Sequence, residues 1–421
     1  MIVTLKNVRS FCNDHAIPLR PLTLLVGENS TGKSTFLAML AQLSQPEFPS
    51  VRPTFNVPPF DLGTFDSIAT FKGGRYGRAD SFAVGFETEK RQITATYISY
   101  KGQPQLSSYL AKGRLGEVSL DVANEPSSVR VTIKPAGEGP RELNLDTQRV
   151  LPTEAGLSVA FLVRIAISES GRLAKDHFDE KMYSLAIDLS RSVVAPVFAL
   201  APIRTKPRRT YDEFSDEFKP EGDHIPVLLA RLWQEEGNPQ KALLVEALDD
   251  FGKKSGLFKQ IGVKRLGKRP TDPFQILVTT AGPPANLPDV GYGVSQALPV
   301  VVQSVLANER RRLLLQQPEV HLHPRAQAAL GSFLAKLVAM DKREFVIETH
   351  SDYLLDRIRL EVAQRNLRAK DVLILFFEKE GLETHVHQIR IDDDGNVTEA
   401  PESYRSFFLQ EELTLFNRIK S

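Results

Sequence analysis

Three stretches of the chain differ in the period of their hydrophobic positions. An apolar run at 22–26 is followed by a Gly-rich loop and by apolar residues at helical spacing over 36–43, which predicts strand, loop and helix. Over residues 80–150, apolar and polar positions alternate, which is typical of antiparallel sheet. Residues 155–195 change to a helical period. The first half therefore predicts a sheet-rich region followed by a helical one.

The last third of the chain alternates between predicted strands and predicted helices. The strands are expected at 275–280, 312–315, 344–347 and 372–377, and the helices at 294–308, 324–338 and 352–364. Because parallel neighbours need a crossover connection, this alternation favours a parallel sheet with helices on both faces. Proline-rich stretches at 46–60 and 199–225 predict irregular chain.

Composition excludes several classes of protein. The 421 residues are 42% apolar and 25% charged, which is typical of soluble globular proteins, and the length suggests about two to three domains. Lys and Arg number 53 against 52 Asp and Glu, so the net charge of +1 excludes binding to nucleic acid or membrane through overall charge. Cys12 is the single cysteine, and no apolar run approaches the ~20 residues of a membrane span. A soluble cytoplasmic protein with no membrane segment is expected.

The most specific motif lies between the buried strand at 22–26 and the helix after it. It matches G-x-x-x-x-G-K-[ST] and comprises Gly27, Glu28, Asn29, Ser30, Thr31, Gly32, Lys33, Ser34 and Thr35. The glycines let the backbone wrap a phosphate, and the loop amides and helix N-terminus supply positive potential. Lys33 is expected to reach the β- and γ-phosphates, and Ser34 to bind Mg²⁺. A chance match is disfavoured by the flanking strand and helix, so the chain is predicted to bind a nucleoside triphosphate.

Three later segments narrow the class of nucleotide-binding protein. They are a Gly-rich turn with a serine at 289–296, an apolar strand that runs into Gln316-Gln317-Pro318-Glu319, and a strand that ends in Thr349-His350-Ser351. In this order after a phosphate loop, they resemble ABC-type ATPases, and within them the AAA15/AAA21 group of OLD-like predicted ATPases. Segments 5–11, 200–204 and 321–324 resemble the same group, so the resemblance covers nearly the whole chain.

The resemblance implies an α/β fold with an ABC-type P-loop NTPase head, a mixed or parallel sheet, a β-rich lobe and a helical insertion. Residues 1–150 would hold the N-terminal part of the head with the phosphate loop and the lobe, 151–198 the insertion, and 199–421 the C-terminal part. ATP and Mg²⁺ are the implied cofactors. Gly293 and Ser295 would form the signature motif, which in this family contacts the γ-phosphate of the partner subunit's ATP in a head-to-tail dimer.

Three histidines need separate interpretation. By the resemblance, His350 would be the switch histidine that senses the γ-phosphate, whereas a strand-end histidine satisfied by a loop carbonyl is the alternative. His321 and His323 lie two residues apart near Glu319 and suggest a metal site. No third ligand is evident, however, and the pair resembles a segment that shapes the dimer interface.

The chain departs from the family pattern at the end of the apolar strand. Where ABC-type enzymes carry two carboxylates, this chain has Gln316, a weak candidate for Mg²⁺, and Gln317 at the catalytic position. A neutral amide orients a water molecule but does not accept its proton. Three explanations are open. Glu319 or Glu348 supplies the missing carboxylate, or hydrolysis is slow and ATP acts as a clamp. In the third, a Glu→Gln change was introduced to trap ATP. Slow hydrolysis assisted by Glu319 or Glu348 is favoured.

Basic residues gather in three places. They are Arg204, Lys206, Arg208 and Arg209, then Lys259, Lys264, Arg265, Lys268 and Arg269, and finally Arg310–Arg312. Solvated surface is the favoured interpretation, because Asp212, Glu213, Asp216 and Glu217 follow the first group. A track for DNA phosphates is the alternative.

The resemblance implies a nucleotide-driven sensor or clamp that regulates a partner effector, such as a TOPRIM or HNH nuclease in anti-phage defence. The active form would be a homodimer or higher homo-oligomer. The chain itself is expected to carry no nuclease, because about 44 residues follow Phe377 and no nuclease motif is evident. A RecF- or Rad50-like DNA-repair ATPase that binds DNA directly is the alternative, although the long coiled coil of Rad50 is missing. A transporter subunit is the weakest interpretation.

Overall fold

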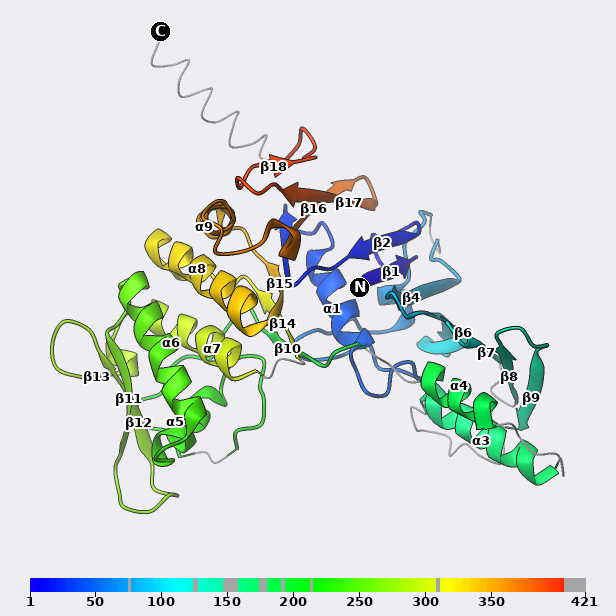
Figure 1. Ribbon diagram of the computed structural model, residues 1–421, viewed down its shortest axis with the longest axis horizontal. Helices are drawn as coiled ribbons and strands as arrows, with labels where there is room; N and C mark the ends of the chain where they lie inside the picture. Colours follow the sequence, from blue (N-terminus) through cyan, green and yellow to red (C-terminus); the bar gives the residue numbers. More distant parts are fainter. Residues whose placement is uncertain are drawn as a thin grey trace, which may run out of the picture. The chain divides into compact units, whose positions relative to one another are not determined.

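The computed structural model (Figure 1) describes residues 1–74, 77–123, 128–146, 158–173, 180–190, 194–212, 215–307 and 311–404. The chain divides into two compact units. The first comprises Met1–Leu19, Ser34–Val197 and Lys379–His385, and the second comprises Arg20–Lys33, Phe198–Glu378 and Val386–Ser421. The boundary predicted at residues 150 and 151 lies outside the described residues.

An eight-stranded antiparallel sheet dominates the first unit. Its order is β2 (His15–Pro18), β1 (Ile2–Lys6), β4 (Ser81–Glu87), β5 (Arg91–Tyr100), β6 (Gln103–Gly113), β7 (Gly116–Val122), β8 (Ser128–Pro135) and β9 (Arg141–Asp146). Burial alternates along these strands, for example in β8, because successive side chains point to opposite faces. The antiparallel sheet predicted from the period-two pattern is confirmed.

Two helices pack on this sheet, where the helical period of residues 155–195 predicted helix. They are α3 (Val159–Leu173) and α4 (Glu180–Ser190), and α4 contacts β6, β7 and β8. Arg91 on β5 donates hydrogen bonds to the carbonyl oxygen of Asp188 at 2.8 Å and to its carboxylate at 2.9 Å. The buried hydroxyl of Tyr109 donates to the carbonyl oxygen of Leu189 at 2.5 Å. These bonds attach the end of α4 to the sheet. The first unit also contains α2 (Phe65–Ile68).

A seven-stranded sheet forms the second unit. Its order is β10 (Val197–Leu200), β14 (Arg312–Gln316), β15 (Glu344–Glu348), β3 (Leu22–Gly27), β16 (Val372–Glu380), β17 (Glu383–Ile391) and β18 (Val397–Thr398). Neighbours from β14 to β16 pair in parallel, while β17 and β18 form an antiparallel hairpin. All five residues of β14 are buried, as expected for a strand covered on both faces. The predicted α/β class with a mixed sheet is confirmed.

The strand expected at 275–280 does not belong to the parallel sheet. It forms β12 (Phe274–Thr279), which lies in a separate antiparallel sheet between β11 (Gln260–Arg265) and β13 (Ala285–Asn286). Short turns join these three strands, so no crossover helix is available to make them parallel. Strand β11 was not predicted, because the lysine and arginine at its end suggested a charged surface segment instead.

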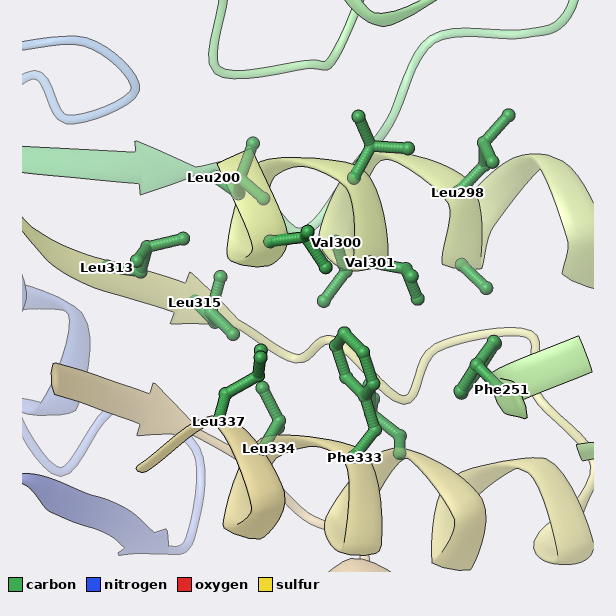
Figure 2. Close-up of a cluster of buried hydrophobic side chains, with 14 of the residues drawn as sticks. Leu200, Phe251, Leu298, Val300, Val301, Leu313, Leu315, Phe333, Leu334 and Leu337 are labelled. Carbon is green, nitrogen blue, oxygen red and sulfur yellow. The ribbon is translucent and has the colours of Figure 1, made fainter. Parts of the chain in front are cut away.

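Helices complete the second unit. They are α5 (Ile225–Gln234), α6 (Pro239–Ser255), α7 (Tyr292–Leu306), α8 (Pro324–Asp341) and α9 (Asp352–Ala363), with short 3₁₀ turns η2 (Leu287–Asp289) and η3 (Ala369–Asp371). Figure 2 shows Leu315 of β14 facing Val300 of α7 and Leu337 of α8 in one buried cluster. This packing fixes the end of β14, where Gln316 lies. No helix in the described part of the chain is long and apolar enough to span a membrane.

Candidate nucleotide-binding site

The phosphate loop follows β3 directly. Gly27 ends the strand with φ 135°, and Gly32 has φ 102°, so both occupy backbone conformations that favour glycine. A Cβ atom on Gly27 would collide with the carbonyl oxygen of Phe377 on β16, which pairs with Gly27 in register. Glycine is therefore required here both for the turn and for close packing of the sheet. After the loop, the chain enters α1 (Lys33–Leu43), as predicted.

The loop is closed by its own polar groups. The hydroxyl of Thr31 donates to the carbonyl oxygen of Glu28 at 2.9 Å. Lys33 Nζ donates to the carbonyl oxygens of Gly27 at 2.9 Å and of Glu28 at 2.6 Å. Burial lowers the pKa of Lys33, and the negative charges of Glu348 and Glu28 oppose that shift. The ammonium group thus lies across the mouth of the loop, in the position from which a phosphate is reached.

The remaining residues of the phosphate loop differ in their exposure to solvent. Glu28, Asn29 and Ser30 are exposed, and Ser30 has a positive φ of 63°. Ser34 follows Lys33 in the first turn of α1, where backbone amides point away from the helix. Thr35 is buried, and its hydroxyl accepts a hydrogen bond from the guanidinium of Arg9 at 3.4 Å.

Two neighbouring strands bring Gln316 and Glu348 together. The last residues of β14 and β15 are paired in parallel register, and Gln316 Nε2 donates to Glu348 Oε2 at 3.4 Å. Both side chains are buried. The negative charge of Glu348 raises the pKa of both Lys33 and His350, against the effect of burial. A buried carboxylate therefore exists beside Gln316, one strand away from the position where the family pattern places it.

The chain turns sharply after β14. Gln317 has a positive φ of 43°, which is uncommon for a residue with a Cβ atom, and its amide donates to the carbonyl oxygen of Glu348 at 2.7 Å. One nitrogen of Arg204 donates to the carbonyl oxygens of Gln316 and Gln317, both at 3.3 Å. The backbone that carries both glutamines is held on one side by β15 and on the other by a buried guanidinium.

Glu319 has a different environment from Glu348. One of its carboxylate oxygens accepts a hydrogen bond from the backbone amide of His350 at 2.8 Å. Burial raises the pKa of Glu319, and its hydrogen bonds and the charge of Arg204 oppose that shift. Glu319 therefore links the turn after β14 to the end of β15. Of the two carboxylates considered in the sequence analysis, Glu348 is the one whose charge acts on Lys33.

His350 lies at the end of β15 with an exposed side chain. Partial burial and the positive charge of Lys33 lower its pKa, while Glu348 opposes that shift. The imidazole is therefore mainly neutral at pH 7, and it can donate a hydrogen bond to an anion. The next residue, Ser351, caps α9 by accepting a hydrogen bond from the amide of Leu354 at 3.0 Å, which fixes the backbone on which His350 stands.

The Gly-rich turn at 289–296 begins α7. Gly291 and Tyr292 are exposed, whereas Ser295 is buried and its hydroxyl donates to the carbonyl oxygen of Tyr292 at 2.7 Å. A Cβ atom on Gly293 would lie 3.1 Å from the carbonyl oxygen of His321, so this glycine permits close packing on the turn after β14. The surface that this turn presents is therefore formed by Gly291, Tyr292 and Gly293, with the Ser295 hydroxyl directed back into the helix.

His321 and His323 have local roles. The ring of His321 packs edge-on against Tyr292 with 5.1 Å between the ring centroids. His323 caps α8, where its Nδ1 accepts a hydrogen bond from the amide of Arg325 at 3.4 Å. Within the described ranges, no three His, Cys, Asp or Glu side chains are grouped as metal ligands.

Part of the predicted basic surface is buried. Arg204 supports the turn after β14, and Arg312 lies within β14 and bonds to Glu344 at 2.5 Å. Neither belongs to a surface track, because each guanidinium is used in internal packing. Arg209 is exposed but forms a double hydrogen bond with Asp289. Glu213 and Arg310 lie outside the described residues.

Sequence reasoning missed two residues that support the site. The guanidinium of Arg9 donates to Thr35 and, at 3.1 Å, to the carbonyl oxygen of Ser67. Arg204 was grouped with surface charges, although it lies at the end of the apolar segment 200–204 that resembles the family. An arginine four residues after an apolar strand was the available signal, because such a residue is able to reach the carbonyl oxygens at a neighbouring strand end.

Replacing Arg204 with methionine is expected to destabilise the protein by about 2 kcal/mol at pH 7. The carbonyl oxygens of Gln316 and Gln317 would lose a donor, and Glu319 would lose a compensating positive charge. The pKa of Glu319 is higher in the folded protein than in the unfolded chain, so the free energy of unfolding falls as the pH rises above the unfolded pKa. Without the positive charge of Arg204, the pKa of Glu319 in the folded protein would rise further, and this loss of stability would be larger. We expect a larger deficit at pH 8 than at pH 5.

Urea unfolding of this variant at both pH values measures the effect. Lys206→Met is the matched control, because Lys206 is exposed two residues away. An unfolding free energy equal to that of the control, or a deficit independent of pH, would contradict the role assigned to Arg204.

This chain is similar in sequence to an ATPase domain family and to a protein named a nuclease. The AAA ATPase domain family (AAA_15) matches residues 155–355, a range that includes the turn at 289–296, both glutamines and His350 but not the phosphate loop. The chain is 22% identical over 377 residues to a protein of Thermus scotoductus named OLD nuclease. That alignment covers 87% of this chain and 61% of the relative, so the chain spans less than two thirds of the relative's length.

Among solved structures, this chain has matches to SMC heads. One is an SMC head bound to the C-terminal winged-helix domain of ScpA, with 13% identity and a TM-score of 0.43, covering 93% of this chain and 97% of that chain. Another is the SMC head domain from Thermotoga maritima, with 11% identity and a TM-score of 0.39, covering 93% of this chain and 98% of that chain.

Proposed function

We propose that this chain is an OLD-like ATPase of the AAA_15 type that uses ATP binding and slow hydrolysis as a switch to regulate a partner effector. The observation that carries the proposal is the pairing of Gln316 with Glu348 beside Lys33. At the ends of β14 and β15 the site offers one carboxylate, that of Glu348, whereas an efficient ABC-type enzyme has a pair. ATP would therefore remain bound for long periods, which suits a switch better than a motor.

Several groups of the chain would bind the phosphates of ATP. Lys33 and the amides at the start of α1 would hold the β- and γ-phosphates. Lys33 would exchange its bonds with the loop carbonyls for bonds with phosphate oxygens, so the ammonium group stays hydrogen-bonded in both states. His350, neutral at pH 7, would donate a hydrogen bond to the γ-phosphate. These contacts favour a bound triphosphate over a diphosphate.

The residues at the strand ends suit Mg²⁺ by their donor chemistry. The amide oxygen of Gln316 is a hard oxygen donor at the end of β14, and Ser34 would add a hydroxyl. Bound Mg²⁺ would neutralise charge on the phosphate oxygens. Because Gln316 is neutral, Glu348 would provide the negative charge that favours the cation at this end of the sheet.

Gln317 would orient the attacking water without accepting its proton. Glu348 is the carboxylate best placed to accept that proton, because its charge acts on Lys33 and His350. Its position on β15 rather than after β14 would make the transfer less efficient, since general-base catalysis depends on hydrogen-bond reach to the water. ATP turnover would be slow, because Gln317 orients the water while Glu348, on the neighbouring strand, accepts its proton.

A homodimer is proposed as the signalling form. The exposed residues Gly291 and Tyr292 and the partly exposed Gly293, at the start of α7, would meet the γ-phosphate of the partner subunit's ATP. Ser295 would join them only if its hydroxyl turned away from the Tyr292 carbonyl. ATP would then hold two subunits together until hydrolysis releases them.

A nuclease is the proposed effector. The relative in Thermus scotoductus is named a nuclease and is longer than the alignment with this chain. We therefore place the nuclease activity of the system in a partner or in a further segment, with this ATPase controlling it. Anti-phage defence is the role proposed for such a pair.

Direct DNA binding is the second candidate. The hairpin of β11 and β12 carries exposed Lys259, Lys268 and Arg269, which form a local basic surface. A repair-type ATPase would bind DNA there through phosphates, so its affinity would fall steeply with salt. Salt-dependent, ATP-dependent binding of a DNA duplex by the chain alone would favour this candidate over the effector-regulating one.

Replacing Gln317 with glutamate is expected to raise ATP turnover by about 10- to 100-fold. The new carboxylate would stand where the attacking water is oriented and would accept its proton. Steady-state phosphate release at saturating Mg·ATP measures the change. Gln260→Glu, at an exposed position at the start of β11, is the control with the same added charge.

The oligomeric state of the same samples, measured by light scattering with ATP, tests the switch. The natural chain is expected to remain dimeric with ATP for longer than Gln317→Glu. If Gln317→Glu turns over ATP no faster than the natural chain, the neutral side chain at 317 is not what limits hydrolysis.

A further inference from the structure

A groove on the second unit lies outside the nucleotide site. It has a volume of about 620 Å³ and runs between the C-terminal end of α6 and the helices α8 and α9. Four cationic side chains line it, namely Lys254, Arg325, Lys336 and Arg357. None of the residues assigned to phosphate binding or hydrolysis takes part.

The two arginines are set firmly in place. Arg325 donates to the carbonyl oxygens of Lys254 at 2.9 Å and Lys253 at 3.2 Å, so it closes the C-terminal end of α6. The stem of Arg357 packs over Gly331, where a Cβ atom would lie 3.1 Å from it. No hydrogen bond or ion pair with another described side chain engages the Arg357 guanidinium, which leaves its donors available.

The acidic groups at the groove do not cancel this charge. Glu361 is buried, and its two oxygens accept hydrogen bonds from Ser332 at 2.5 Å and Asn366 at 2.8 Å. Asp250 pairs with Lys254 at 2.9 Å and lies 3.9 Å from Lys336. One shared aspartate and one internally bonded glutamate thus face four cations, so the groove has an excess of positive charge.

The floor of the groove is apolar. It is formed by Ala328, Ala329 and Ala339, and Met340 at the end of α8 is 70% exposed. A large apolar side chain exposed beside several cations is unfavourable in water alone and is typical of interaction surfaces. Methionine suits such a surface because its flexible thioether adapts to different partners.

We propose that this groove docks a short acidic segment of a partner protein, with carboxylates on Arg357, Lys336 and Arg325 and an apolar side chain over Met340. Arginine forks match carboxylates in a bidentate geometry. A nucleic-acid strand fits less well, because the lining offers no aromatic ring for a base to stack on, and phosphates do not need an apolar floor.

This inference extends the effector-regulating function proposed above, since it names the chemistry by which an effector would be held. It can fail without that function failing, because ATP turnover and the groove use different residues. A partner that docks elsewhere would leave the ATPase proposal intact. Loss of ATPase activity would leave the groove unchanged.

Fluorescence anisotropy with a defined peptide tests the proposal. The probe is a fluorescein-labelled peptide of about twelve residues that alternates glutamate with leucine, and its control replaces every glutamate with glutamine. The full chain should bind the acidic peptide and bind the glutamine peptide at least about ten-fold more weakly. A single-stranded oligonucleotide of the same length and label is the rival probe.

Lys336→Glu with Arg357→Glu should weaken binding of the acidic peptide by about ten-fold or more. The matched control is Lys90→Glu with Lys370→Glu, which makes the same charge change at exposed positions outside the groove. Met340→Glu is a second variant at a highly exposed position that folding tolerates, and it should also weaken binding. Thermal unfolding and ATP binding of each variant should match those of the natural chain.

Three results would overturn the proposal. The first is equal affinity of the groove variant and its control for the acidic peptide. The second is equal affinity of the natural chain for the glutamate and glutamine peptides. The third is tighter binding of the oligonucleotide that is lost in the same groove variants, which would assign the surface to nucleic acid.

Discussion

Replacing Glu348 with glutamine is expected to lower ATP turnover by about 100-fold while leaving ATP binding within a few-fold of the natural chain. Glu348 is buried beside Gln316 and acts electrostatically on Lys33 and His350. With Gln316 and Gln317 both neutral, no other carboxylate with these two electrostatic neighbours stands at the ends of β14 and β15. Steady-state phosphate release at saturating Mg·ATP measures the loss, and equilibrium binding of a labelled ATP analogue measures affinity.

Glu344→Gln is the matched control for this variant. Glu344 begins the same strand, at the end remote from the phosphate loop, and glutamine there still accepts the hydrogen bond from Arg312. The control should keep the turnover of the natural chain. If Glu348→Gln hydrolyses ATP as fast as Glu344→Gln, the catalytic carboxylate lies elsewhere, and Glu319→Gln becomes the variant to measure.

Replacing Lys33 with alanine is expected to weaken ATP binding by about 100-fold and to abolish measurable turnover. Lys33 is the charged group that spans the mouth of the loop, where it bonds to the Gly27 and Glu28 carbonyls. Without it, the negative charge of Glu348 would face the phosphates with no adjacent compensating lysine. Isothermal titration with ATP and Mg²⁺ measures the affinity.

Lys33→Arg separates charge from geometry. The guanidinium keeps the positive charge but is planar and larger than an ammonium group, so it should restore part of the binding and little of the turnover. Unchanged ATP affinity in Lys33→Ala would contradict the assignment of this loop as the phosphate site.

The sequence predicted the parts of the fold that depend on local patterns. The phosphate loop was identifiable because glycines, lysine and hydroxyl residues occur at fixed spacing between strand and helix. The parallel strands β14, β15 and β16 were identifiable from short apolar runs separated by helical periods. Strand β12 was placed in the wrong sheet, because a single strand's sequence does not reveal whether its neighbour arrives by a turn or by a crossover.

The site was harder to predict because its decisive contacts are long-range. Glu319 and Glu348 were equivalent candidates in the sequence, since nothing local shows which carboxylate faces Lys33. The parallel register that pairs Gln316 with Glu348 separates them. Arg204 was misjudged for the same reason. Its charge suggested a position on the surface. Its guanidinium is instead buried and donates hydrogen bonds to the carbonyl oxygens of Gln316 and Gln317, more than a hundred residues later in the sequence.

The measurement that tests the central claim most directly is a single-turnover experiment with radiolabelled ATP on the purified natural chain. It follows bound ATP and bound ADP over time and records the oligomeric state in parallel. The account predicts that ATP binds at about one per chain and is converted to ADP well below the ~10 s⁻¹ typical of enzymes, with a dimer present until conversion. A chain that retains no nucleotide, or one that hydrolyses ATP at that typical rate, would contradict it.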